Sequence, residues 1–193
     1  HAGQESPQIT LDPKLSAHYE VEMWRAYYGK HYFSLWQLLV NYLAYQLNIN
    51  TYQAALVTFY ATTDAMKFSH LSAQAKLSEI NQAVLPHLRT FYQSINVVTQ
   101  SKWLVDEVAR AELAWWQMRR TVGKNSVERV GKKITELYSL LYGQTNYCLQ
   151  KAGYYRAFAA KLSDTQKIKQ QINWLQLKQQ LQLAYRWLNR GIH

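Results

Sequence analysis

Residues 111–123, AELAWWQMRRTVG, place an acid, two tryptophans and two arginines in the last turns of an expected helix. Successive helical residues are turned by about 100°, so with Glu112 as reference Trp115 falls at about −60° and Arg119 at about −20°. Glu112 and Arg119 therefore lie on the apolar face of this helix. Because isolated buried charge is very unfavourable, we expect each to have a partner, and the two could share an intermediary from another helix.

The same projection places further charged side chains at or near apolar faces. Asp64 lies among apolar residues of the helix expected over 51–68, and Arg156 lies at the centre of a strip of small residues in the helix expected over 145–162. In the expected first helix, a polar stripe separates two apolar faces. The candidate buried polar residues are His18, Glu22, Arg25, Asp64, Glu112, Arg119 and Arg156.

Such a set has two interpretations. The structural one is a satisfied network of ion pairs and tyrosine hydroxyls that fixes which helices pack together. The functional one is a polar pocket in which a carboxylate is an acid or base and an arginine clamps an anionic group. His18 and Glu22 have usable metal-ligand spacing, but the chain contains no Glu-x-x-His, the motif of dimetal bundles. We therefore predict no metal and no cofactor.

Helices are the elements that must position these side chains. With only 7 Gly and 3 Pro in 193 residues, tight turns are few and helix-forming residues dominate the long stretches. We predict an all-α protein of seven or eight helices arranged as consecutive antiparallel hairpins in one globular bundle, with an α-α superhelix as the alternative. Residues 1–11 are predicted to be a flexible tail and residues 12–193 a single domain. The expected helices span 13–28, 31–47, 51–68, 72–97, 101–122, 125–143, 145–162 and 163–189.

Local sequence signals set these boundaries. The predicted helix starts are Asp12-Pro13, Asn50 or Thr51, Asn125 with Glu128, Thr145 or Asn146, and Ser163 with Gln166. Gly29, Gly123, Gly143 and Gly191 mark expected ends. Pro86 is expected to kink or split the fourth helix, because proline removes a helical hydrogen bond.

The net charge of +10 is unevenly distributed. Residues 1–113 contain 8 Lys and Arg against 9 Asp and Glu, whereas residues 114–193 contain 14 against 3. A field of one sign attracts nucleic acid, acidic protein surfaces or anionic lipid, although a basic protein can also simply stay in solution. The candidate residues for binding an anionic partner are Arg120, Lys124, Arg129, Lys132 and Lys133.

Three further features bear on location and assembly. The single cysteine, Cys148, favours a cytoplasmic protein, although a signal peptide removed before His1 would leave no trace. The longest apolar run, 34–47, falls short of the roughly 20 residues of a membrane span, so no transmembrane segment is predicted. Residues 168–188 carry two apolar sides, which predicts either a central helix or a homodimer interface.

Three stretches carry a resemblance: ELAWWQMRR (112–120), LYSLLYG (137–143) and YYRAFAAKLSD (154–164). They resemble segments of uncharacterised all-helical bacterial proteins that carry an ELAWWxxRR-type stretch. The resemblance covers part of the chain and implies no activity.

We therefore expect a soluble interaction or regulatory module, most simply non-catalytic, whose basic C-terminal half contacts an anionic partner. The alternative is an enzyme or small-ligand-binding protein with a buried site of carboxylates and arginines.

Overall fold

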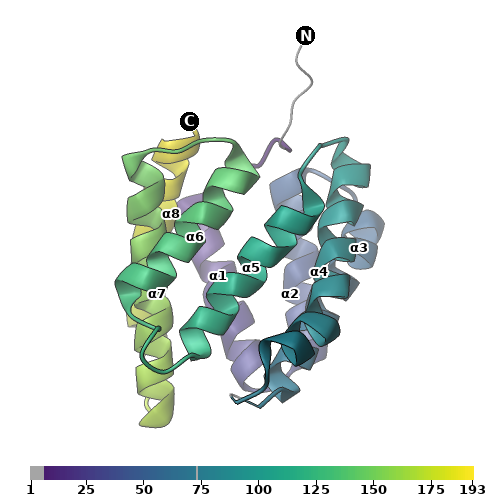
Figure 1. Ribbon diagram of the computed structural model, residues 1–193. Helices are drawn as coiled ribbons and strands as arrows, with labels where there is room; N and C mark the ends of the chain where they lie inside the picture. The colour runs from purple at the N-terminus through teal and green to yellow at the C-terminus, as the bar shows by residue number, and fades with distance from the viewer. Residues whose placement is uncertain (1–6, 73) are drawn as a thin grey trace. The chain divides into compact units, whose positions relative to one another are not determined.

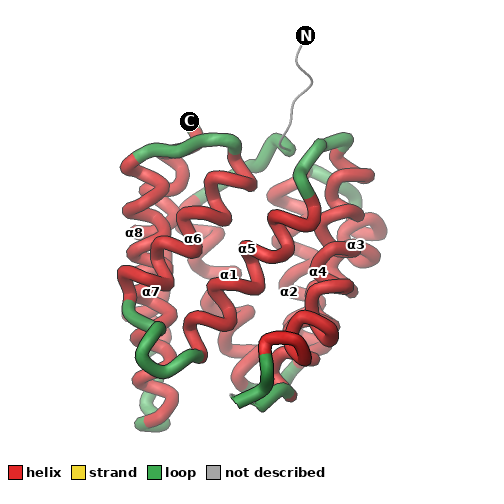
Figure 2. The backbone as a smooth tube through the Cα atoms, viewed as in Figure 1, coloured by secondary structure: helices red, strands yellow, loops and turns green. Residues whose placement is uncertain are grey.

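The computed structural model describes residues 7–72 and 74–193, and these residues form eight α-helices and no strand (Figures 1 and 2). The prediction of an all-α protein is confirmed. The helices are α1 (Pro13–Tyr28), α2 (Tyr32–Leu47), α3 (Thr51–His70), α4 (Leu77–Thr99), α5 (Val105–Arg120), α6 (Val127–Tyr142), α7 (Tyr147–Ile168) and α8 (Trp174–Ile192).

The chain forms two compact units. Unit 1 contains the described residues up to Thr10 together with Glu22–Arg110, and unit 2 contains Leu11–Val21 and Ala111–His193. The division falls inside α1 and inside α5, so each of these helices contributes one part to each unit. Of the expected tail 1–11, residues 1–6 lie outside the described residues. Pro7 is buried, and the backbone N–H of Thr10 donates to the Gln46 carbonyl at 2.9 Å.

Unit 1 is built around α2, α3 and α4, with α3 packed against both neighbours. Val57 and Thr58 of α3 and Leu88 of α4 are fully buried in its core. Two side-chain hydrogen bonds join α2 to α3. The Trp36 indole donates to the Ala55 carbonyl at 3.2 Å, and the hydroxyl groups of Tyr32 and Ser69 lie 2.6 Å apart.

Unit 2 is built around α6, α7 and α8, which lie side by side with α7 between the other two (Figure 1). Contacts at both ends make α7 and α8 antiparallel: Asn146 Nδ2 donates to the Gly191 carbonyl at 2.9 Å, and Gln166 Nε2 donates to Gln176 Oε1 at 3.0 Å. Helices adjacent in sequence therefore pack as antiparallel neighbours in this unit, as the hairpin prediction expected.

The closest approach of α6 and α7 occurs at two glycines. A Cβ atom on Gly153 would overlap Thr135 Oγ1 and would lie 2.6 Å from the Gly131 carbonyl oxygen. A Cβ atom on Gly131 would lie 3.1 Å from Tyr154 Cα. The small residues around Arg156 were predicted to let another helix approach closely, and Gly153 permits such a contact between α7 and α6.

Gly153→Ala is expected to lower the free energy of unfolding by about 1–3 kcal/mol, because backbone atoms of α6 must move to make room. Gly131→Ala is the matched comparison and should cost less, since its nearest contact is longer. Urea unfolding followed by circular dichroism measures both. Equal losses in the two variants would contradict this account of the helix contact.

Several predicted helix starts are confirmed. The Asp12 carboxylate accepts hydrogen bonds from the backbone N–H groups of Lys14 and Leu15, and Asn50 forms a capping box with Gln53. Asn146 caps α7 as expected. The cap of α6 is Ser126 rather than Asn125, one residue later than predicted.

Several boundary predictions are wrong. Helix α5 begins at Val105 rather than near Ser101, and α8 includes Gly191, which was expected to lie beyond its end. The helix α7 continues through Ser163 to Ile168, and α8 begins at Trp174 behind the cap Asn173. Ser163 does not cap a helix because its hydroxyl donates to the Ala160 carbonyl and accepts from Arg119. Helix α4 begins at Leu77, later than expected, and runs through Pro86 as one helix.

Candidate functional site

The buried charge of unit 2 centres on Arg156 of α7. Its Nε donates to Glu20 Oε1 of α1 at 2.8 Å, and its Nη1 donates to the Tyr138 hydroxyl of α6 at 3.4 Å. The Tyr185 hydroxyl of α8 donates to the other oxygen of Glu20. The Glu20 residue is only 2% exposed. Four helices therefore meet through one ion pair and two tyrosine hydroxyls.

Aromatic rings surround the same guanidinium. Arg156 Cζ lies 5.1 Å from the centre of the Trp115 ring and 6.0 Å from that of Tyr138, distances at which a cation is attracted to a ring face. The Trp115 indole N–H donates to Glu112 Oε2 at 3.2 Å. We call this set the Arg156 cluster: Glu20, Glu112, Trp115, Tyr138, Arg156 and Tyr185.

Burial dominates the electrostatics of the Arg156 cluster. It raises the pKa of the Glu112 carboxyl, and the positive charge of Arg156 opposes this increase. It likewise raises the pKa of the Tyr138 hydroxyl. Burial disfavours the charge of Arg156, but Glu20, Tyr138, Tyr185 and Glu112 together outweigh that effect and raise the pKa of Arg156 well above its usual range. The guanidinium is therefore permanently charged; it pairs directly with Glu20 and acts on Glu112 through its charge.

A second ion pair links α5 and α7. Arg119 Nε donates to Asp164 Oδ2 at 2.8 Å, and its Nη2 donates to Asp164 Oδ1 and to the Ser163 hydroxyl, each at 3.0 Å. This two-point contact between a guanidinium and a carboxylate fixes orientation as well as distance. Glu112 and Arg119 thus both interact with α7, Glu112 through the charge of Arg156 and Arg119 through Asp164.

Asp64 in unit 1 has a different environment. Asp64 is 0% exposed, and within the described chain neither of its carboxyl oxygens has a hydrogen-bond partner. The nearest base is His87 of α4, whose Nδ1 lies 3.8 Å from Asp64 Oδ1, beyond hydrogen-bond distance. Burial raises the pKa of Asp64 to about 8, partly opposed by Lys67. Burial also lowers the pKa of His87, so at neutral pH a protonated acid faces a neutral imidazole.

Three of the predicted buried residues require correction. His18 and Arg25 are exposed, and Glu22 is half-buried and forms an ion pair with Arg25 at 3.6 Å. The reason is the orientation of α1, whose buried face carries Ser16, Ala17, Glu20 and Val21 rather than the predicted stripe. The stripe therefore faces outward and contributes nothing to the Arg156 cluster.

Four polar residues of these sites were not predicted from the sequence: Glu20, Asp164, Tyr185 and His87. The burial of Glu20 could have been predicted, since Glu20 shares a helical face with Ala17 and lies four residues from Ser16. No sequence pattern indicated the roles of Asp164 and Tyr185, because their partners lie on other helices far away in the sequence.

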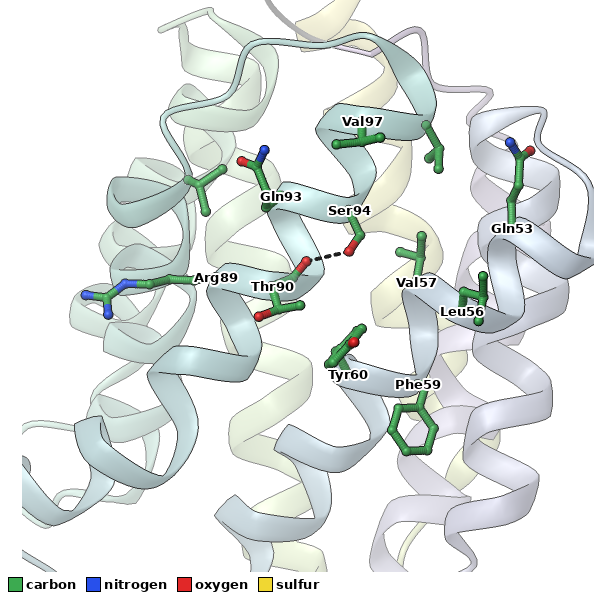
Figure 3. A pocket seen from close by; sticks show the side chains of 12 residues that line it. Gln53, Leu56, Val57, Phe59, Tyr60, Arg89, Thr90, Gln93, Ser94 and Val97 are labelled. Atoms are coloured by element: carbon green, nitrogen blue, oxygen red, sulfur yellow. Dashed lines mark hydrogen bonds between the residues drawn. The ribbon is translucent and has the colours of Figure 1, made fainter.

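Unit 1 also carries a groove of about 730 Å³ between α3 and α4 (Figure 3). Leu56, Phe59 and Tyr60 line it from α3, and Thr90, Ser94 and Val97 line it from α4. The lining is mainly apolar, and it includes no residue of the Arg156 cluster. The groove and the buried charges of unit 2 are therefore separate features.

Among the described residues, no group of three or more His, Cys, Asp and Glu side chains is placed to hold a metal ion. In residues 7–72 and 74–193, no helix combines the length and apolar character needed to cross a bilayer.

Comparison of the chain with protein-family models, curated proteins and solved structures finds no match.

Proposed function

We propose that this protein is a non-catalytic helical interaction module that binds an anionic partner through unit 2. The observation that carries the proposal is which cations pair with the few acids of residues 114–193 and which cations have no such partner. Asp164 pairs with Arg119, and Glu136 pairs with Lys133 at 3.1 Å. Lys124 and Lys132 are exposed, and they form no ion pair with any described residue.

The cationic residues gather around one connection. We call Arg120, Lys124, Arg129, Lys132 and Lys133 the α5–α6 cationic segment. Two contacts order its loop: Arg129 Nη1 donates to the Gly123 carbonyl at 2.9 Å, and Lys161 Nζ contacts the Asn125 carbonyl at 3.5 Å. An ordered loop presents its charges to a partner at a lower entropic cost than a disordered one.

The contacts of the Arg156 cluster favour this role over the alternative of an enzyme or ligand-binding protein. Glu20, Tyr138 and Trp115 already surround the guanidinium, which is the arrangement of a satisfied structural network. A catalytic role requires these groups to face a substrate cavity, and the groove described above lies in unit 1 instead.

A homodimer through residues 168–188 is a further proposal. Fewer apolar side chains of this segment are available for the contact than the sequence indicated. Leu177, Leu181 and Leu188 are buried inside unit 2, so they are unavailable to a second copy. Ile168 and Leu175 are exposed and would have to form the contact.

The proposal predicts that Lys124→Gln/Lys132→Gln weakens the binding of heparin, a polyanion without bases or acyl chains. The slope of log affinity against log salt should fall by about 1–2, because each lost anion contact removes close to one released counterion. Fluorescence anisotropy over a salt series measures this slope.

The matched control is Lys30→Gln/Lys102→Gln, which removes the same charge from two exposed positions in unit 1. Equal changes in the two double variants would show that only net charge matters. In that case the α5–α6 cationic segment would not be the binding surface.

A further inference from the structure

A second surface of unit 2 combines an exposed tyrosine ring and a half-buried tryptophan ring with cations. Tyr147, the first residue of α7, is 61% exposed, and its ring meets that of Trp187 of α8 edge to face at 6.0 Å. Lys151 Nζ lies 5.3 Å from the Tyr147 ring centre, and Arg190 Cζ lies 5.2 Å from that of Trp187. We call these four residues the aromatic–cation surface.

The helices beneath this surface are held in place. Asn146 caps α7 through the backbone N–H of Leu149 and also donates to the Gly191 carbonyl of α8. Gly191 allows the close contact, because a Cβ atom there would lie 2.9 Å from Leu149 Cδ2. The two rings are therefore presented by elements that are fixed relative to each other.

We propose that the aromatic–cation surface binds single-stranded nucleic acid, with a base stacked on the exposed ring of Tyr147 and phosphates held by Lys151 and Arg190. This inference rests on the proposed function, since it names the class of the anionic partner. Every base has a flat face that can stack on an aromatic ring, and adjacent cations neutralise the backbone.

The positions of the exposed aliphatic side chains argue against a lipid bilayer as the partner of this surface. In the described part of unit 2 the large exposed ones are Val122, Ile168 and Leu175. They lie in the α5–α6 loop, at the end of α7 and at the start of α8, all away from Tyr147 and Trp187. The surface therefore offers rings and cations without the aliphatic side chains that enter acyl chains.

The distance to the α5–α6 cationic segment suits an extended strand. Lys161 contacts the loop of that segment, and it follows Tyr147 by 14 positions on the same helix, which is about 21 Å along the axis. A strand of several nucleotides can reach both surfaces, within the site sizes of about 4–16 nucleotides common for single-strand binding.

The test measures the affinity of the full chain for a labelled oligothymidylate of about 15 nucleotides by fluorescence anisotropy. Tyr147→Leu is expected to lower this affinity about tenfold and to leave heparin binding unchanged, because only the oligonucleotide has bases to stack. Tyr147→Phe retains the ring and should bind normally. Tyr52→Leu removes a tyrosine of unit 1 that is 74% exposed and serves as the matched control.

Each result has a distinct meaning. Oligothymidylate binding that depends on the Tyr147 ring supports the inference. Equal binding by wild type and Tyr147→Leu overturns it while leaving the proposed function standing. Preferential, Tyr147-dependent binding to phosphatidylserine vesicles overturns it in favour of a lipid. Failure to bind either heparin or the oligonucleotide overturns the inference and the proposed function together.

Discussion

Wild type is expected to lose stability as the pH rises from 6.5 to 8, and Asp64→Asn is expected to abolish this loss. Folding raises the pKa of this buried acid from 3.8 to about 8, so in this range the folded chain keeps a proton that the unfolded chain has released. The free energy of unfolding therefore falls by about 1.4 kcal/mol per pH unit well below pH 8, and by about 1.6 kcal/mol over the whole range. The slope halves at pH 8, where the folded carboxyl is half ionised, and disappears about one pH unit higher.

The pH range is chosen because His87 acts in the opposite direction below it. Burial lowers the pKa of His87 from 6.5, so the unfolded chain binds the extra proton in acid and stability falls as the pH drops below 6.5. Urea unfolding at several pH values measures the slope for wild type, for Asp64→Asn and for the exposed control Glu107→Gln. A wild-type slope that survives in Asp64→Asn would show that another group binds the proton.

The loss of stability caused by the buried Asp64 carboxyl contrasts with the arrangement of the buried charges in unit 2. Glu20 is paired with Arg156, whose charge also acts on Glu112, whereas Asp64 is kept in the core by protonation. A buried carboxyl without a hydrogen-bond partner lowers stability at neutral pH, and buried polar groups that lack partners are uncommon in proteins.

Helix positions were largely predictable because their signals are local. Asp12-Pro13, Asn50 and Asn146 act on backbone groups within one turn, so the sequence contains both partners of each contact. Ser163 misled the prediction for the converse reason: its hydroxyl interacts with Arg119, which is 44 positions away.

The buried charges were predictable only in part. Helical projection identified Glu112, Arg119 and Arg156 because their neighbours on the same face are apolar or small. It misjudged α1 because a helix with two apolar sides leaves its orientation open, and packing in the structure buries Glu20 instead of Glu22. Projection gives the angle of a residue on its own helix, whereas the choice of partner depends on tertiary packing.

Arg156→Met is expected to lower the free energy of unfolding by about 3–5 kcal/mol, the largest loss for any substitution proposed. The loss arises because methionine leaves Glu20 in the core of unit 2 without its counter-charge, and Glu112 loses the positive charge that opposes its protonation. Lys151→Met removes a cation from a half-buried position of the same helix that forms no ion pair with any described residue, and it should cost less than about 0.5 kcal/mol. Chemical unfolding of both variants provides the comparison.

A double-mutant cycle separates the ion pair from simple loss of packing. If the stranded Glu20 charge causes most of the loss, Glu20→Gln in the Arg156→Met background will recover part of it, whereas Glu20→Gln in wild type will destabilise. Additive losses would mean that the arginine stabilises unit 2 mainly by its stacking on Trp115. Arg156→Lys distinguishes these cases further, because lysine keeps the charge but not the planar contact with the ring.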